Sequence, residues 1–98
     1  MIARHLWGRG APVILLHGWT MGGDIWAPVA ERLDAASVAP DLPAHGGTRG
    51  YAPTVAGGVA MLGDLIATGG LADVTLVGWS LGALIGWQYL AQGGTGVA

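Results

Sequence analysis

Residues 74–82 read VTLVGWSLG, and this stretch near the C-terminal end of the 98-residue sequence decides the fold. Its first part is a short β-branched and aliphatic run, which is typical of a strand buried on both faces. Residues 81–92 follow as an apolar segment long enough for a helix, and their apolar character on nearly all sides predicts a helix that is enclosed. A serine therefore stands at the turn between a predicted strand and a predicted helix.

Ser80 is the candidate nucleophile because a sharp turn from strand to helix raises a serine hydroxyl above the sheet edge. Gly78 and Gly82 flank it, as that turn requires, since side chains there collide with the neighbouring strand and helix. The backbone N–H of Leu81 lies at the helix N-terminus and is one candidate donor for an oxyanion hole. The alternative is a chance match in a sequence with 19 glycines.

A second oxyanion donor is expected in the loop that follows an earlier strand. The segment LLHGW, residues 15–19, stands in that place. Gly18 allows close approach of the backbone, and the N–H of Trp19 is the candidate donor. The alternative for Trp19 is a place in the core.

The other elements alternate between strands and helices, which predicts βαβ units and a mostly parallel sheet. Asp24 is a candidate cap for the first helix, whose Ile25, Val29 and Leu33 have helical spacing. Pro40 is expected near the end of its strand because it has no N–H to donate. The expected strands are residues 2–7, 11–18, 36–43 and 74–79, and the expected helices are residues 25–33, 54–68 and 81–92.

Composition narrows the possible functions. The sequence is 52% hydrophobic and only 10% charged, with a net charge of −2, so nucleic acid is not an expected partner. No cysteine is present, which excludes disulfides and thiolate metal sites, and no other metal-ligand spacing occurs. Residues 74–98 carry no charge, and a membrane-inserted tail is the alternative to a buried strand and helix.

Three segments together resemble the α/β-hydrolase fold family: PVILLHGW at 12–19, DLPAHGGTRG at 41–50 and LVGWSLGALIGW at 76–87. Ala44 departs from the pattern, because the family usually has glycine there. The resemblance implies an α/β fold, namely a three-layer αβα arrangement with a mostly parallel sheet. It also implies that residues 1–98 are the N-terminal part of a single domain, truncated after the helix that follows Ser80.

The resemblance further implies a serine carboxylic-ester hydrolase in which Ser80 carries the acyl group. The N–H groups of Trp19 and Leu81 would hold the oxyanion and touch the substrate, and His17, Gly18, Gly78 and Gly82 would be structural residues around the site. Within the family, the motifs are most similar to carboxylesterases that act on a carrier-bound acyl methyl ester in biotin synthesis. The implied partner is a small-molecule or acyl-carrier-protein-bound ester, with no cofactor, no nucleic acid, no membrane and a cytoplasmic location.

In this family the acid and the histidine of the triad follow the serine at a distance, so neither is expected within residues 1–98. The resemblance makes His17 and His45 structural side chains that bond backbone near the site. Other titratable residues have simpler expected roles: turns or caps for Asp24 and Asp41, and exposed surface for His5, Asp64 and Asp73.

Several alternatives stay open, and the sequence specifies no oligomeric state. Lactonases, thioesterases, C–C hydrolases, cofactor-free haloperoxidases and acyltransferases share the serine of this turn. The alternative outside the enzymes is a non-catalytic chain that pairs with a second subunit through its sheet edge and the helix of residues 81–90.

Overall fold

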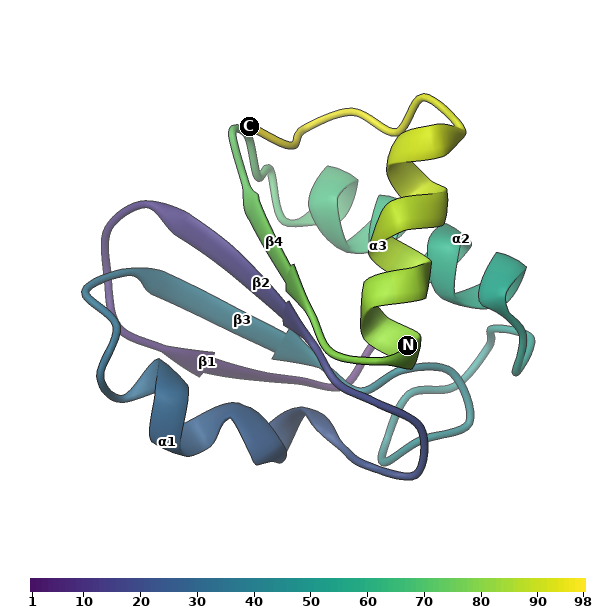
Figure 1. The fold of residues 1–98 in the computed structure, drawn as a ribbon, viewed down its shortest axis with the longest axis horizontal. Coiled ribbons are helices and arrows are strands. Elements are labelled where there is room, and N and C mark those ends of the chain that lie inside the picture. Colours follow the sequence, from purple (N-terminus) through teal and green to yellow (C-terminus); the bar gives the residue numbers. More distant parts are fainter.

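A four-stranded sheet lies at the centre of the computed structural model, which describes residues 1–98 (Figure 1). Its strands stand in the order β1-β3-β2-β4. Strand β2 pairs in parallel with both β3 and β4, whereas β1 runs antiparallel to β3 at one edge. The predicted mostly parallel sheet is therefore confirmed. The strands are β1 (Arg4–Trp7), β2 (Pro12–Leu16), β3 (Ala36–Pro40) and β4 (Thr75–Gly78).

Helices cover both faces of the sheet, which confirms the three-layer arrangement (Figure 1). The long helices α2 (Val55–Thr68) and α3 (Leu81–Ala91) lie on one face, and the short η1 (Gly23–Trp26) and α1 (Ala27–Ala30) lie on the other. Side chains of β2 alternate between the two faces: Ile14 and Leu16 join the core cluster under α2 and α3, and Leu15 packs with Ala30 of α1.

Pro40 is the last residue of β3, opposite Arg4 of β1. This confirms the prediction that a residue without an N–H stands at a strand end. The chain leaves the sheet directly after Pro40, so Asp41 and Leu42 begin the loop beside the carboxyl end of β2.

The first helix differs from its prediction. In place of one helix over 25–33, a 3₁₀ turn is followed by a single α-helical turn, Ala27–Ala30. Gly22 occupies the N-cap without any side-chain bond, so the predicted cap by Asp24 is wrong. The inward face carries Trp26 and Ala30, whereas the expected Ile25, Val29 and Leu33 are exposed.

Helix α2 begins where the sequence predicts, with the Thr54 hydroxyl accepting the N–H of Gly57 at 2.9 Å. Its buried face starts with Gly57 and Gly58 and continues through larger apolar residues. A Cβ on Gly58 would lie 2.5 Å from Ile85 of α3, so this glycine sets how closely the two helices approach.

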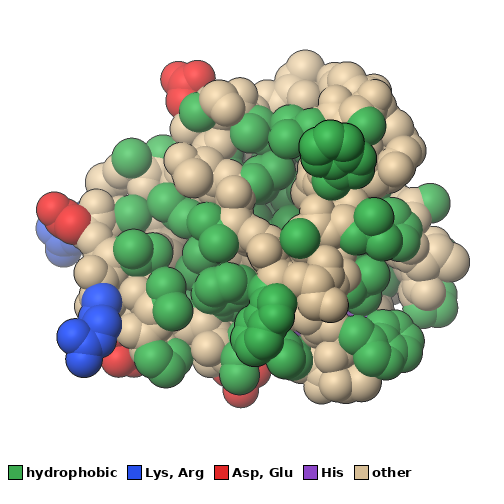
Figure 2. Space-filling model, in the orientation of Figure 1, with side chains coloured by type: hydrophobic (Ala, Val, Ile, Leu, Met, Phe, Trp, Pro, Cys, Tyr) green, Lys and Arg blue, Asp and Glu red, His purple; other side chains and the backbone are tan.

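Helix α3 is not enclosed, contrary to the prediction. Ile85 and Tyr89 are buried, but Leu84, Trp87 and Leu90 are 50%, 71% and 48% exposed. Strand β4 beside it pairs only with β2 and forms the other edge of the sheet. Figure 2 shows hydrophobic side chains spread over the face on which β4 and α3 lie. No helix combines the length and the apolar character needed to cross a bilayer.

Candidate functional site

Ser80 occupies a tight turn between β4 and α3. Its backbone has φ 54° and ψ −115°, and the N–H of Gly82 bonds the carbonyl of Trp79 at 3.0 Å across the turn. These are the angles of the first central position of a type II′ turn, which glycine normally occupies. The Ser80 side chain is exposed and makes no hydrogen bond. A strained backbone thus holds a free hydroxyl at the surface.

The glycines around Ser80 allow the turn to sit tightly on the sheet. A Cβ on Gly78 would lie 2.6 Å from Cα of Ala83, and one on Gly82 would overlap the carbonyl of Leu16 at the end of β2. Any side chain at either position therefore forces α3 away from β4 and β2. The expected structural role of these two glycines has a direct steric cause.

The loop after β2 passes next to Ser80. A Cβ on Gly18 would lie 3.5 Å from Cβ of Ser80, which is ordinary van der Waals contact and shows how close the loop is to the serine. The loop then turns sharply, with the N–H of Met21 bonding the carbonyl of Gly18 at 3.2 Å. Thr20 within this turn has φ 67°, a conformation that costs a non-glycine residue about 1–2 kcal/mol.

Two backbone N–H groups beside Ser80 have no partner. Neither the N–H of Trp19 nor that of Leu81 donates a hydrogen bond within the chain. Leu81 is the first residue of α3, where the N–H groups of a helix have no intrahelical acceptor and the helix dipole favours negative charge. These two donors are available to a ligand.

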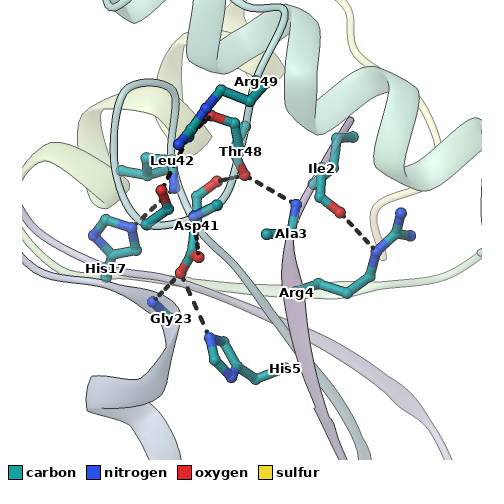
Figure 3. Close-up of polar contacts among 12 residues, drawn as sticks. Ile2, Ala3, Arg4, His5, His17, Gly23, Asp41, Leu42, Thr48 and Arg49 are labelled. Carbon is teal, nitrogen blue, oxygen red and sulfur yellow. Dashed lines mark hydrogen bonds and ion pairs between the residues drawn. The ribbon is translucent and has the colours of Figure 1, made fainter.

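His17 is fully buried directly before this loop. Its Nε2 accepts the N–H of Leu42 at 2.9 Å, so the proton is on Nδ1, which donates to the carbonyl of Gly18 at 2.7 Å. Figure 3 shows the bond to Leu42. Burial lowers the pKa of His17 below the usual 6.5, although the bond to Gly18 acts in the opposite direction. The ring is therefore neutral at neutral pH.

His45 is fixed in the same way from the other loop. Its Nε2 accepts the N–H of Thr20 at 3.0 Å, which leaves Nδ1–H to donate to the carbonyl of Pro43 at 2.9 Å. Its ring also meets the edge of Trp19, with centroids 5.3 Å apart. The free electron pairs of both His17 and His45 are thus occupied by backbone N–H groups, and neither ring is free to accept the proton of Ser80.

Asp41 ties the two loops together (Figure 3). Its carboxylate accepts the N–H of Gly23 at 2.8 Å and the N–H of Gly47 at 3.1 Å, with Nε2 of His5 3.6 Å away. Burial acts to raise the pKa of Asp41, but the two N–H bonds and the nearby histidines outweigh it and hold the pKa below the usual 3.8.

The sequence predicts a local turn or cap role for Asp41 and a surface position for His5. In the structure, Asp41 instead bonds Gly23, 18 residues earlier in the chain, and His5 lies next to its carboxylate. No local pattern encodes either contact: the pairing of β1 with β3 brings His5 near Asp41, and the parallel pairing of β2 with β3 brings the two loops of Gly23 and Asp41 to the same end of the sheet.

The other acidic residues singled out from the sequence are exposed. Asp64 is exposed on α2, where it accepts the hydroxyl of Tyr51 at 2.6 Å, and Asp73 is exposed in the turn before β4. Asp24 is exposed in η1. No three acidic or histidine side chains come close enough together to hold a metal ion.

A pocket of about 270 Å³ opens between the loop after β2 and the start of α3. Trp19 and Leu81, the residues with the two free N–H groups, both line it, and most of its remaining wall is apolar. This largely apolar wall suits an uncharged ligand group. Its lining residues are Trp19, Leu42, Pro43, His45, Pro53, Thr54, Val55, Leu81 and Ile85.

Comparisons with known proteins agree with this geometry. The family model described as alpha/beta hydrolase fold matches residues 11–98. A pimeloyl-[acyl-carrier protein] methyl ester esterase of Chromobacterium violaceum is 38% identical over 87 residues, which are 87% of this chain and 33% of that protein. A non-heme chloroperoxidase of Kitasatospora aureofaciens is 36% identical, over 92% of this chain and 34% of its own length.

Among solved structures, an N-acyl homoserine lactonase complexed with N-butanoyl homoserine superimposes with a TM-score of 0.83. It is 34% identical, and the match covers 93% of this chain and 36% of the lactonase. The chain therefore spans about a third of the length of the relatives that it matches.

Proposed function

The chain belongs to the alpha/beta hydrolase fold family, and we propose that it carries the nucleophile and oxyanion-binding part of a serine carboxylesterase. One observation carries this proposal: the exposed, unbonded hydroxyl of Ser80 stands on a strained turn, a nucleophile elbow, next to the two N–H groups that have no partner in the chain. Hydrolases of this type need a nucleophile and two oxyanion donors at one place.

In the proposed reaction, Oγ of Ser80 attacks the carbonyl carbon of an ester, and its proton passes to a histidine. The N–H groups of Trp19 and Leu81 bind the oxygen that becomes negative in the tetrahedral intermediate. The alcohol leaves with a proton from that histidine, which gives an acyl-serine, and water then releases the acid. No cofactor takes part in these steps.

We assign the activating histidine and its acid to residues outside 1–98. His17 and His45 are the imidazoles nearest the loop after β2, and each already accepts a backbone N–H on its unprotonated nitrogen. Recruiting either as the base would leave a backbone donor without an acceptor, at a cost of about 1–3 kcal/mol. In this reading, residues 1–98 by themselves have little or no esterase activity.

The proposed substrate is a carboxylic ester, and the most specific form of the proposal is a carrier-bound acyl methyl ester in the cytoplasm. The apolar pocket beside Trp19 and Leu81 suits an acyl chain. The methyl ester esterase of Chromobacterium violaceum, at 38% identity, supports this substrate class. The likeness to the lactonase and the chloroperoxidase keeps lactones and haloperoxidase chemistry as competing activities of the same serine.

A second candidate function is pairing with another polypeptide. The observation that favours it is the outer edge of β4, which is unpaired beyond the bridge between Val74 and Val97, together with the exposed Leu84, Trp87 and Leu90 of α3. A segment that adds a strand to β4 and covers α3 would bury both. Pairing of this kind does not need the hydroxyl of Ser80, which separates it from the esterase.

The first test is to determine the gene sequence after the codon for Ala98, and the second is to assay the full-length protein. Cleavage of p-nitrophenyl butanoate and of an acyl methyl ester should fall by a factor of about 10³ or more in Ser80→Ala. Ser37→Ala is the matched control, because Ser37 is buried in β3 and its hydroxyl has no partner. Unchanged activity in Ser80→Ala refutes the esterase, and unchanged partner binding in that inactive variant supports pairing.

A further inference from the structure

We infer that His17, held as its Nδ1–H tautomer, is a positioning residue that aims the N–H of Trp19 into the oxyanion site. The inference rests on the proposed function, because it concerns a donor of that site. It goes further by assigning the direction of this donor to one nitrogen of one buried side chain.

The peptide between Gly18 and Trp19 contains the carbonyl of one residue and the N–H of the next. The chain has no cis peptide bond, so this peptide is planar and trans. In a trans peptide, the C=O of one residue and the N–H of the next point in opposite directions. Whatever fixes the carbonyl of Gly18 therefore also fixes the N–H of Trp19, on the other side of the same plane.

The carbonyl of Gly18 is fixed by two donors. Nδ1–H of His17 reaches it at 2.7 Å, and the N–H of Met21 reaches it at 3.2 Å across the turn. The shorter of the two bonds comes from a fully buried ring. The carbonyl is thus drawn toward the buried imidazole, and the N–H of Trp19 points away from it.

The ring of His17 is itself anchored to a different strand. Its Nε2 accepts the N–H of Leu42, two residues beyond the end of β3, at 2.9 Å. This bond fixes the tautomer, because only Nδ1 then carries a proton to give to Gly18. The imidazole thus links the loop after β3 to the peptide between Gly18 and Trp19. Nε2 accepts a hydrogen bond from Leu42, and Nδ1–H donates one to Gly18.

The neighbouring peptide is held by similar means. The N–H of Thr20 donates to Nε2 of His45 at 3.0 Å, and Thr20 keeps its positive φ of 67°. The carbonyl of Gly18 before Trp19 and the N–H of Thr20 after it are therefore both hydrogen-bonded. The N–H of Trp19 between them donates no hydrogen bond within the chain.

Two substitutions at His17 separate its two tasks. In His17→Asn, the amide nitrogen stands near the place of Nδ1 and still donates to Gly18, but the N–H of Leu42 loses its acceptor. In His17→Gln, the amide oxygen stands near the place of Nε2 and still accepts from Leu42, but the donor to Gly18 is lost. His5→Gln is the control, because the half-buried His5 ring lies beside Asp41 and bonds neither the carbonyl of Gly18 nor the N–H of Leu42.

In the full-length protein we expect kcat of His17→Gln to fall at least about 10-fold with KM nearly unchanged, because the donor acts in the transition state. His17→Asn should keep kcat within about threefold although it unfolds at the lower temperature of the two, since its buried Leu42 N–H is unpaired. Activity and thermal stability then rank the variants in opposite orders. A merely structural His17 predicts that activity follows stability, and that result overturns the inference.

Ser80→Ala in the same assay distinguishes failure of the proposed esterase function from failure of the inference about His17. If it keeps full activity, the proposed function fails, whatever the His17 variants do. If it is inactive while His17→Gln is no worse than His17→Asn, only the inference fails.

A readout without turnover uses ¹⁵N-labelled full-length protein. Imidazole ¹⁵N shifts should identify His17 as the Nδ1–H tautomer, and residual dipolar couplings should show the Trp19 N–H reoriented in His17→Gln but not in His17→Asn. An Nε2–H tautomer, or an unmoved Trp19 N–H in His17→Gln, overturns the inference.

Discussion

Three residues with side chains near the candidate site adopt backbone angles that glycine adopts more easily. Thr20, Ala44 and Ser80 have φ of 67°, 62° and 54°. Each such residue costs about 1–2 kcal/mol and persists only where its surroundings hold it in place. Hydrogen bonds hold Thr20 through His45 and Ser80 through the turn from Trp79 to Gly82. The strain is concentrated where the two free N–H donors and the free hydroxyl meet.

Replacing Ser80 should therefore separate strain from chemistry. Ser80→Gly is expected to raise the free energy of unfolding by about 1 kcal/mol relative to Ser80→Ala, because only glycine relaxes at φ 54°. Both variants lack the hydroxyl and should be equally inactive as esterases. Urea unfolding measures the difference, and equal midpoints for the two variants would show that this turn stores no strain.

Asp41 should give the chain a pH-dependent stability. Its pKa is lower in the folded state than the usual 3.8, so the folded state binds fewer protons between the two values. The stabilisation is complete above about pH 4 and is lost as the pH falls through the folded-state pKa.

We expect Asp41→Asn to cost about 2 kcal/mol at pH 7, since one of two charge-assisted N–H bonds is lost and the other is weakened. The difference in free energy of unfolding between wild type and Asp41→Asn should narrow below pH 3.8. Urea unfolding between pH 2.5 and 7 is the measurement. A gap that is constant over this range contradicts the assignment, and Asp73→Asn is the exposed control.

At the scale of single elements, the two glycines of α2 illustrate how packing overrides propensity. Gly58→Ala places a Cβ 2.5 Å from Ile85, whereas Gly63→Ala places one 3.6 Å from the ring of Tyr89, an ordinary contact. Both changes gain up to about 1 kcal/mol of helix propensity. We expect Gly63→Ala to stabilise the chain by nearly that amount and Gly58→Ala to destabilise it by about 1–2 kcal/mol after overpacking.

Thermal unfolding of the two single variants checks this pair. If Gly58→Ala stabilises the chain as much as Gly63→Ala does, then α2 and α3 do not pack closely enough at Gly58 to exclude a Cβ.

The strands and the two long helices were predictable from sequence because their signals are local. Aliphatic runs, helical apolar spacing and the glycine-bounded Ser80 place these elements near the bounds that the structure has. The inward faces were less predictable. The hydropathy and helical spacing of Ile25, Val29 and Leu33 favour these residues as the buried face of the first helix. The buried side of that segment is instead formed by Trp26 and Ala30. Hydropathy cannot select glycine or alanine as an inward position, although small residues allow the closest packing.

The candidate site was predictable in its parts but not in its connections. Ser80, Trp19 and Leu81 follow from motif spacing alone. The bonds from Asp41 to Gly23, from His17 to Leu42 and from His45 to Thr20 join residues 18 to 25 positions apart, and sequence gives no signal for them. They depend on β2 and β3 lying side by side in parallel, which brings the two loops to one end of the sheet.

At the scale of the whole molecule, the two sides of the sheet end differently. At one edge β1 runs antiparallel to β3, whereas at the other edge β4 lies beside the exposed side of α3 (Figure 1). A chain with 10% charged residues has few charges with which to protect such an edge. The same feature supports both proposed functions, since a larger hydrolase domain or a second polypeptide would cover it.

The last prediction follows from this asymmetry. Residues 1–98 produced alone should self-associate at tens of micromolar, because contiguous exposed apolar surface and an open strand edge favour association. Trp87→Glu combined with Leu90→Glu places two charges on the exposed side of α3 and should shift the chain toward monomer without loss of helix content. Ala56→Glu, which adds a charge on the exposed side of α2, is the control and should leave association unchanged. Sedimentation velocity with circular dichroism on the same samples distinguishes the outcomes. If the wild-type segment is monomeric, or if Ala56→Glu disperses it as well as the double variant, then β4 and α3 are not the surface that another polypeptide covers.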